Sequence, residues 1–291
     1  MSDLAAVPAE VRARLAVRFG PAAQEWCAGL PSLVTELAGR WGLTVLSAGG
    51  GGTSRVFRCS RAGGDGAGGG TVWLKLTPDP EVARQEAVAL RAWGGLASVV
   101  GLLDYEPAAH ALLLADVRPG GPLRQEGWRP AEMAPLLGAL RSAPVDGLAL
   151  GPLADRVEFL FGLTERRAPG AVPPAARAFA RELAAGGPVA LVHGDLHPGN
   201  VLAGPAGPVA IDPRPSLGDP DFDLVDWAVD GVTDLPALRR RISGLAALVP
   251  GSDPERVLAW CRATAVIVAA PRVAAGRRDA ETAFLAELAG I

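Results

Sequence analysis

Two histidines and an aspartate alternate in the segment LVHGDLHPGN, which spans residues 191–200. The chain holds only three histidines, so two of them in one short segment mark a candidate site. Imidazole and carboxylate groups bind zinc or iron, and His193, Asp195 and His197 would share one face of a strand. A proline and two glycines favour a loop instead, and no further protein ligand can be nominated. A metal-dependent hydrolase stays open as one interpretation.

The same segment also fits a loop that supports phosphoryl transfer. Protein-kinase catalytic loops follow the pattern H-R-D-L-x-x-x-N, in which the aspartate accepts the proton of the attacking hydroxyl and the asparagine holds Mg²⁺. His193, Asp195 and Asn200 reproduce this spacing, with glycine in place of arginine. Asp212 ends the next predicted strand, where a second metal-binding carboxylate is needed. On this interpretation His193 and His197 orient the loop by hydrogen bonds.

Lys75 is the only lysine in a chain rich in arginine, alanine, glycine and proline. A coding bias against lysine explains this composition, so Lys75 is either a chance survivor or a site that needs a compact ammonium. It lies on a predicted strand at 71–77, and a helix at 79–93 follows. Kinases hold such a lysine with a helix glutamate. Acids such as Glu81 are favoured in a first helical turn regardless of function, so we predict Glu86 as the partner.

A glycine run, GGGGTS at residues 49–54, connects two predicted strands. Its backbone N–H groups could cover phosphates, with Thr53 and Ser54 contacting the β-phosphate. The run does not match G-x-G-x-x-G, so a flexible hairpin connection remains the alternative.

The elements that must position these residues divide at RPGGP, residues 118–122. The first part is predicted to hold two N-terminal helices with breaks at Gly20-Pro21 and near Pro31, then strands and one helix. The second part is predicted to be helical around a small hairpin, with helices at 129–140, 153–167, 173–186, 222–230, 234–248, 254–270 and 279–289. This order predicts an α+β fold with an N-lobe at residues 1–117 and a C-lobe at residues 118–291.

Composition narrows the class of protein. The 291 residues are 49% apolar, which suits two lobes with a substantial core, and the net charge of −3 favours neither a nucleic-acid nor a membrane-surface partner. Cys27, Cys59 and Cys261 are far apart and odd in number, which fits a reducing compartment. The N-terminus lacks the pattern of a signal peptide, and the apolar run at 263–271 is too short to span a bilayer. We expect a cytoplasmic protein of open oligomeric state.

The segments LVHGDLHPGNVL and AIDPRPSLGDPDFDL resemble the aminoglycoside phosphotransferase family of small-molecule kinases. Residues 25–43, 74–95 and 102–117 are similar to its streptomycin 6-phosphotransferase and hydroxyurea phosphotransferase branch, and the likeness extends to about residue 230. The resemblance implies a protein-kinase-like fold with a β-rich N-lobe and a mainly helical C-lobe. It also implies ATP, Mg²⁺ and phosphorylation of a hydroxyl on an antibiotic or similar small molecule.

The resemblance implies a role for each candidate residue. Asp195 is the catalytic base, and Asn200 and Asp212 are the Mg²⁺ ligands. Lys75 with Glu86 anchors the phosphates of ATP.

The resemblance further implies contacts around the hinge strand. The backbone of Ala115 and Val117 would contact adenine, while Asp219 and Asp223 would brace the catalytic loop and start the next helix. Trp73 departs from the family, because related kinases usually keep a small residue there. It would stack on the base, narrow the pocket or indicate a different strand register.

The sequence says least about which molecule accepts the phosphoryl group. Three arginines at 239–241 and the pair at 277–278 argue against a strongly cationic acceptor, although Asp221, Asp226 and Asp230 could bind one. A metabolite kinase of the same fold and a non-catalytic nucleotide-binding regulator remain alternatives.

Overall fold

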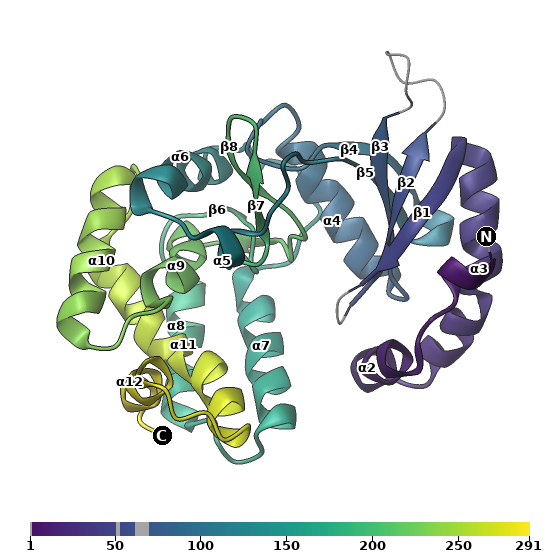
Figure 1. Cartoon of the computed structure of the whole chain (residues 1–291). Helices are drawn as coiled ribbons and strands as arrows, with labels where there is room; N and C mark the ends of the chain where they lie inside the picture. Colours follow the sequence, from purple (N-terminus) through teal and green to yellow (C-terminus); the bar gives the residue numbers. More distant parts are fainter. Residues whose placement is uncertain (1, 51–52, 62–69) are drawn as a thin grey trace. The chain divides into compact units, whose positions relative to one another are not determined.

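The structure is a computed structural model that describes residues 2–50, 53–61 and 70–291 (Figure 1). The chain forms two compact units, residues 1–95 with 100–117 and residues 96–99 with 118–291. The predicted N-lobe, residues 1–117, includes residues 96–99. They belong to the second unit because the Ala210 N–H donates to the Ser98 carbonyl (2.8 Å) and Val99 forms a parallel bridge with Ala210.

The first unit is built on an antiparallel five-stranded sheet, in the order β1-β2-β3-β5-β4. Strand β3 is central, so Lys75 pairs with Val56 on one side and Leu112 on the other. Its helices and strands are α1 (Ser2–Ala5), α2 (Ala9–Phe19), α3 (Ala22–Trp41), β1 (Leu43–Gly49), β2 (Arg55–Arg61), β3 (Thr71–Leu76), α4 (Pro80–Ala92), β4 (Leu102–Glu106), η1 (Pro107–Ala109) and β5 (Ala111–Ala115).

Side-chain alternation in β3 separates the core from the candidate site. Leu74 and Leu76 are fully buried in a cluster with apolar residues of α2 and α3, whereas Lys75 faces the opposite side, toward α4. Helix α3 runs through Pro31, so the predicted break there is wrong. Burial of Leu30 and Val34 on either side of the proline outweighs the backbone hydrogen bond that it removes.

Helix α4 begins as its sequence predicts. The Asp79 side chain accepts hydrogen bonds from the backbone N–H groups of Glu81 (2.9 Å) and Val82 (3.4 Å), and Pro80 occupies the first turn. This cap fixes the start of the helix, and with it the phase that turns Glu86 inward.

The second unit is mainly helical, with two small strand pairs, β6 with β9 and β7 with β8. The predicted helix at 222–230 is replaced by a 3₁₀ segment and one short helix, and β9 was not predicted. The elements are α5 (Leu123–Glu126), α6 (Pro130–Arg141), α7 (Leu153–Arg167), α8 (Pro174–Ala185), β6 (Ala190–Val192), β7 (Val201–Gly204), β8 (Gly207–Ala210), β9 (Ser216–Gly218), η2 (Pro220–Leu224), α9 (Val225–Val229), α10 (Leu235–Leu248), α11 (Pro254–Ala274) and α12 (Ala280–Ala289).

Helix α11 is the central helix of the second unit and packs against α7, α8 and α12 (Figure 1). With 21 residues it is longer than the apolar run at 263–271. Within the described residues it alone has the length and composition to cross a membrane. Its most apolar window is 56% buried against the rest of the fold, as in the core helix of a globular unit.

Candidate functional site

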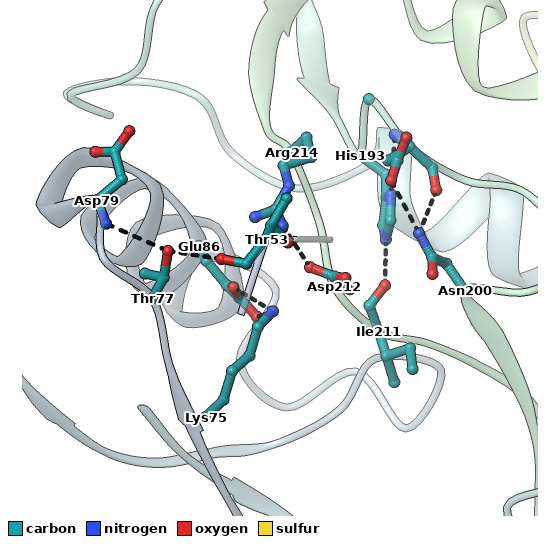
Figure 2. Close-up of polar contacts among 12 residues, drawn as sticks. Thr53, Lys75, Thr77, Asp79, Glu86, His193, Asn200, Ile211, Asp212 and Arg214 are labelled. Carbon is teal, nitrogen blue, oxygen red and sulfur yellow. Dashed lines mark hydrogen bonds and ion pairs between the residues drawn. The ribbon is translucent and has the colours of Figure 1, made fainter. Parts of the chain in front are cut away.

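The Lys75 ammonium group and the Glu86 carboxylate form a closed ion pair in the first unit (Figure 2). The Lys75 Nζ atom lies 2.7 and 2.6 Å from the two Glu86 oxygens, and the residues are only 4% and 0% exposed. Glu81 instead binds Arg84 at the surface (2.7 Å). The predicted contact between Lys75 and Glu86 is therefore present. Two charges buried this deeply require both their mutual attraction and their hydrogen bonds.

The end of the glycine run is tied to the strand that carries Lys75. Thr53 and Ser54 are buried, and the Thr77 hydroxyl donates a hydrogen bond to the Thr53 carbonyl (2.9 Å; Figure 2). A side chain at Gly50 would place its Cβ 2.7 Å from the Ser54 carbonyl oxygen, so this close approach requires glycine. Residues 51–52, the rest of the predicted phosphate-covering run, lie outside the described residues.

The hinge strand is held by Trp73. Its indole N–H donates to the Asp116 carboxylate (2.7 Å), which links β3 to the residue after β5. Ala115 ends β5, its N–H bonds the Gly101 carbonyl (2.8 Å), and Val117 follows in a half-buried loop. The regular register of β3 excludes a strand shift as the reason for the tryptophan. This hydrogen bond accounts for a large side chain at that position.

In the second unit, Asp195 and Asn200 lie in one turn of the loop between β6 and β7. The Asn200 amide N–H₂ group donates to both the carbonyl (2.9 Å) and the carboxylate (3.1 Å) of Asp195. Both hydrogen bonds of the Asn200 side chain to Asp195 use the amide nitrogen. The amide oxygen therefore points away from Asp195. The Asp195 side chain is 34% exposed, so its carboxylate is open to a ligand.

Both histidines of the segment serve the loop. The buried His193 accepts the Asp195 N–H at Nδ1 (3.3 Å), and its Nε2 lies 3.1 Å from the Ile211 carbonyl. Burial lowers the His193 pKa to about 4, which keeps the ring neutral. His197 accepts the Gly199 N–H (3.0 Å). Within the described residues, no group of three or more His, Cys, Asp or Glu side chains is placed to hold a metal ion.

Asp223 braces the loop that carries Asp195, as predicted. Its carboxylate accepts the backbone N–H groups of His193 (2.7 Å) and Gly194 (2.9 Å), while burial raises its pKa to about 7. Asp219 caps η2 and accepts the indole N–H of Trp260 (2.6 Å). The two aspartates thus connect the loop to α11 through η2.

Asp212 follows β8 with a left-handed backbone, φ 55°. Such a conformation is uncommon outside glycine and concentrates at functional sites. The Arg214 guanidinium lies 3.0 Å from the Asp212 carboxylate (Figure 2), and the Arg214 backbone N–H donates to the His193 carbonyl (2.8 Å). Arg214 therefore links the carboxylate of Asp212 to the loop that carries Asp195.

Sequence reasoning missed Arg156, on α7. Its Nε donates to the Gly194 carbonyl (2.9 Å) and its Nη2 to the Asp195 carboxylate (3.0 Å). Nothing in the sequence distinguishes this arginine, because arginines are common throughout the chain. Arg156 also precedes Asp195 by 39 residues in the sequence.

A cavity of about 170 Å³ lies beside Asp195 within the second unit. Its wall is largely apolar, and besides Asp195 it holds the carboxylates of Asp223 and Asp226, whose pKa values are raised by burial. The lining residues are Leu160, Gly194, Asp195, Leu196, His197, Phe222, Asp223, Val225, Asp226, Thr264, Ile267 and Val268.

Comparison with known proteins identifies relatives over most of the chain. The family of aminoglycoside/hydroxyurea antibiotic resistance kinases matches residues 44–276, beyond the point near residue 230 where the predicted likeness ended. Streptomycin 6-kinase of Streptomyces glaucescens is 33% identical over 277 residues, covering 89% of this chain and 88% of that protein. Hydroxyurea phosphotransferase of Kitasatospora aureofaciens is 38% identical over 270 residues, covering 87% and 76%.

Solved structures share the fold at low sequence identity. Choline kinase LicA from Streptococcus pneumoniae has a TM-score of 0.61 at 16% identity, covering 89% of this chain and 99% of that one. A thermostable mutant of aminoglycoside phosphotransferase APH(4)-Ia, in ternary complex with AMP-PNP and hygromycin B, has a TM-score of 0.56 at 19% identity, covering 88% and 97%. The predicted kinase-like α+β fold is thus confirmed. The chain belongs to the aminoglycoside/hydroxyurea antibiotic resistance kinase family and is a small-molecule phosphotransferase.

Proposed function

We propose that this protein transfers the γ-phosphoryl group of ATP to a hydroxyl of a small molecule, an antibiotic such as streptomycin or a related compound. The observation that carries this proposal is the Asp195 carboxylate, held by Asn200 and exposed in the wall of a cavity. Phosphoryl transfer needs little covalent chemistry from the protein, so catalysis comes from alignment and charge neutralisation. Asp195 would orient the acceptor hydroxyl and receive its proton.

The residues after Asp195 fit Mg²⁺. Magnesium prefers oxygen ligands and uses one or two carboxylates together with substrate phosphates. The Asn200 amide oxygen is turned away from the loop by the bonds of its nitrogen, and the Asp212 side chain is 32% exposed. We assign these two residues as the Mg²⁺ ligands. The ion, when bound, neutralises negative charge on the transferring phosphoryl group.

The first unit would bind the nucleotide. Lys75 would contact the phosphates, and Glu86 would hold its ammonium in place. The buried Thr53 and Ser54 would contribute contacts to the β-phosphate.

The adenine ring would meet the backbone of the hinge strand. Ala115 and Val117 flank Asp116, which the Trp73 indole already fixes. The strand therefore offers its backbone groups in a defined orientation. We place the reaction in the cytoplasm, where ATP is abundant.

Among the three aspartates considered for a cationic acceptor, Asp226 is the best placed. Asp221 is engaged by Arg141 (3.1 Å) and Asp230 by the Trp128 indole (2.8 Å). Within the described residues the Asp226 carboxylate makes no hydrogen bond or ion pair, and it lines the cavity beside Asp195. The apolar wall around it suits contact between Asp226 and one cationic or N–H-donating group near the hydroxyl of the acceptor.

The test uses the full chain with ATP, Mg²⁺ and either streptomycin or hydroxyurea. Acceptor-dependent ADP release and a phosphorylated acceptor in the mass spectrum are the expected result. Asp226→Asn should raise the KM for streptomycin at least about tenfold, because a charged hydrogen bond is lost, and Asp230→Asn is the matched control. ATP binding without a phosphorylated product, across these compounds and a wider hydroxyl panel, would instead favour the non-catalytic regulator.

A further inference from the structure

The loop position where protein kinases carry arginine is closed to side chains in this fold. Gly194 has φ +74°, and a Cβ there would lie 2.2 Å from the Arg214 carbonyl oxygen. That carbonyl belongs to the backbone and cannot rotate away. An arginine at residue 194 is therefore excluded, and a cation beside Asp195 must come from elsewhere in the chain.

Helix α7 supplies that cation through Arg156. The guanidinium spans two acceptors at once, the Gly194 carbonyl and one Asp195 carboxylate oxygen. Its side chain is 10% exposed, so it is fixed by packing as well as by hydrogen bonds. The planar fork of the guanidinium directs two N–H donors at these two acceptors in a fixed geometry, whereas a lysine ammonium is a point charge without that planar geometry.

Asp195 is thereby held at both of its oxygens. Arg156 binds Oδ1 (3.0 Å) and the Asn200 amide binds Oδ2 (3.1 Å). A carboxylate that is one-third exposed would otherwise sample several rotamers. Two directional contacts from different elements leave it one orientation.

We propose that Arg156 is a positioning residue for phosphoryl transfer, which holds the Asp195 carboxylate toward the acceptor hydroxyl. This inference rests on the proposed role of Asp195. It assigns to α7 a part in catalysis that the loop motif does not reveal. Because misplacement of a reacting group costs rate more than binding, the effect should fall on kcat rather than on KM.

A matched control exists in the same unit. Arg141 also bridges a carboxylate and a backbone carbonyl, those of Asp221 (3.1 Å) and Pro250 (3.1 Å), and its side chain is 11% exposed. Arg141→Gln therefore removes an equally buried fork that does not contact Asp195. A loss that is merely structural should affect both variants alike.

The experiment measures kcat and KM of the full chain, with ATP and whichever of streptomycin or hydroxyurea the wild type phosphorylates. Arg156→Gln should lower kcat about 100-fold and leave the KM for ATP within about threefold. Arg156→Lys should recover only part of the rate. Added methylguanidine should restore part of the rate of Arg156→Ala, while Arg141→Gln should keep kcat within about twofold at a comparable loss of thermal stability.

Asp195→Asn, assayed in parallel, separates the two ways of failing. If it is inactive while Arg156→Gln keeps the wild-type kcat, the positioning role is wrong and the proposed function stands. If Asp195→Asn is fully active, the proposed role of Asp195 as the base is wrong, and the positioning role of Arg156 fails with it. Equal kcat losses in the Arg156 and Arg141 variants, with no methylguanidine rescue, would reduce Arg156 to a structural residue.

Discussion

The ion pairs of the candidate site differ between the two units in which partner is buried. In the first unit both members of the Lys75–Glu86 pair are buried, with side chains 5% and 1% exposed. In the second unit Arg156 is 10% exposed and Asp195 is 34% exposed. Arg214 and Asp212 repeat that asymmetry, at 9% and 32%. At the candidate site, the first unit therefore encloses both charges of its pair, whereas the second encloses the two arginines and leaves their carboxylates partly exposed.

This difference matches the chemistry proposed for each unit. A closed pair fixes an ammonium group in one place, which suits contact with a phosphate. Outward carboxylates remain available to a metal ion or a hydroxyl, while buried arginines fix their direction. Removing one member should therefore cost stability in the first unit and rate in the second.

The largest effect on stability is expected from Lys75→Met. This variant leaves the buried Glu86 carboxylate without its ammonium partner, so the free energy of unfolding should fall by about 3–5 kcal/mol. The double variant Lys75→Met/Glu86→Leu removes both charges and should recover most of that loss. Urea unfolding measures the stability of all three proteins.

Nucleotide binding separates stability from function in the same variants. Titration calorimetry with ATP should show that neither variant binds normally, even where stability returns. Normal ATP affinity in the stable double variant would contradict the assignment of Lys75 to the phosphates.

A smaller effect, dependent on pH, is expected from His193. Its pKa is lowered to about 4 in the fold from about 6.5 when unfolded, so the unfolded chain binds more protons between these values. The contribution of His193 to the free energy of unfolding is fully present above the unfolded pKa. It falls as the pH drops, by about 2 kcal/mol between about pH 7 and pH 5.

His193→Asn should lack this decrease. Asp223, with its raised pKa, gives a slope of opposite sign in both proteins, so it cancels when the two urea-unfolding curves are subtracted. A difference that does not change with pH would show that His193 is not held neutral in the fold.

The smallest effect is expected at the hinge strand. Trp73→Phe removes the hydrogen bond to Asp116 and should lower the unfolding free energy by about 1 kcal/mol. Asp116→Asn keeps an acceptor oxygen and should change stability less. Thermal unfolding measures the stability of both variants. Equal losses of stability in Trp73→Phe and Asp116→Asn would show that the indole N–H does not contribute.

The contacts that sequence could predict are local or follow directly from the order of elements. Glu86 was preferred to Glu81 because it lies inside the helix that follows the lysine strand, and the pair is present. The spacing of Asp195 and Asn200 within one loop made their proximity predictable. The helix cap at Asp79 is predictable because it depends only on neighbouring residues of the sequence.

The remaining features depend on packing between distant segments. Arg156 reaches Asp195 across 39 residues of chain, and its type carries no signal in an arginine-rich sequence. The predicted helix at 222–230 is interrupted where the Asp223 carboxylate binds the backbone of His193 and Gly194. The N–H of Leu217, in β9, bonds the Gly151 carbonyl, another contact that a local pattern cannot contain.

Phosphoryl transfer at Asp195 is tested most directly by following γ-labelled ATP in the wild type and in Asp195→Asn, with ATP affinity measured on the same samples. The wild type should deliver the label to the acceptor. Asp195→Asn should transfer it about 1,000-fold more slowly while binding ATP with unchanged affinity, because a positioned base contributes 10²–10⁴-fold. Transfer by Asp195→Asn at the wild-type rate would contradict the assignment of Asp195 as the base.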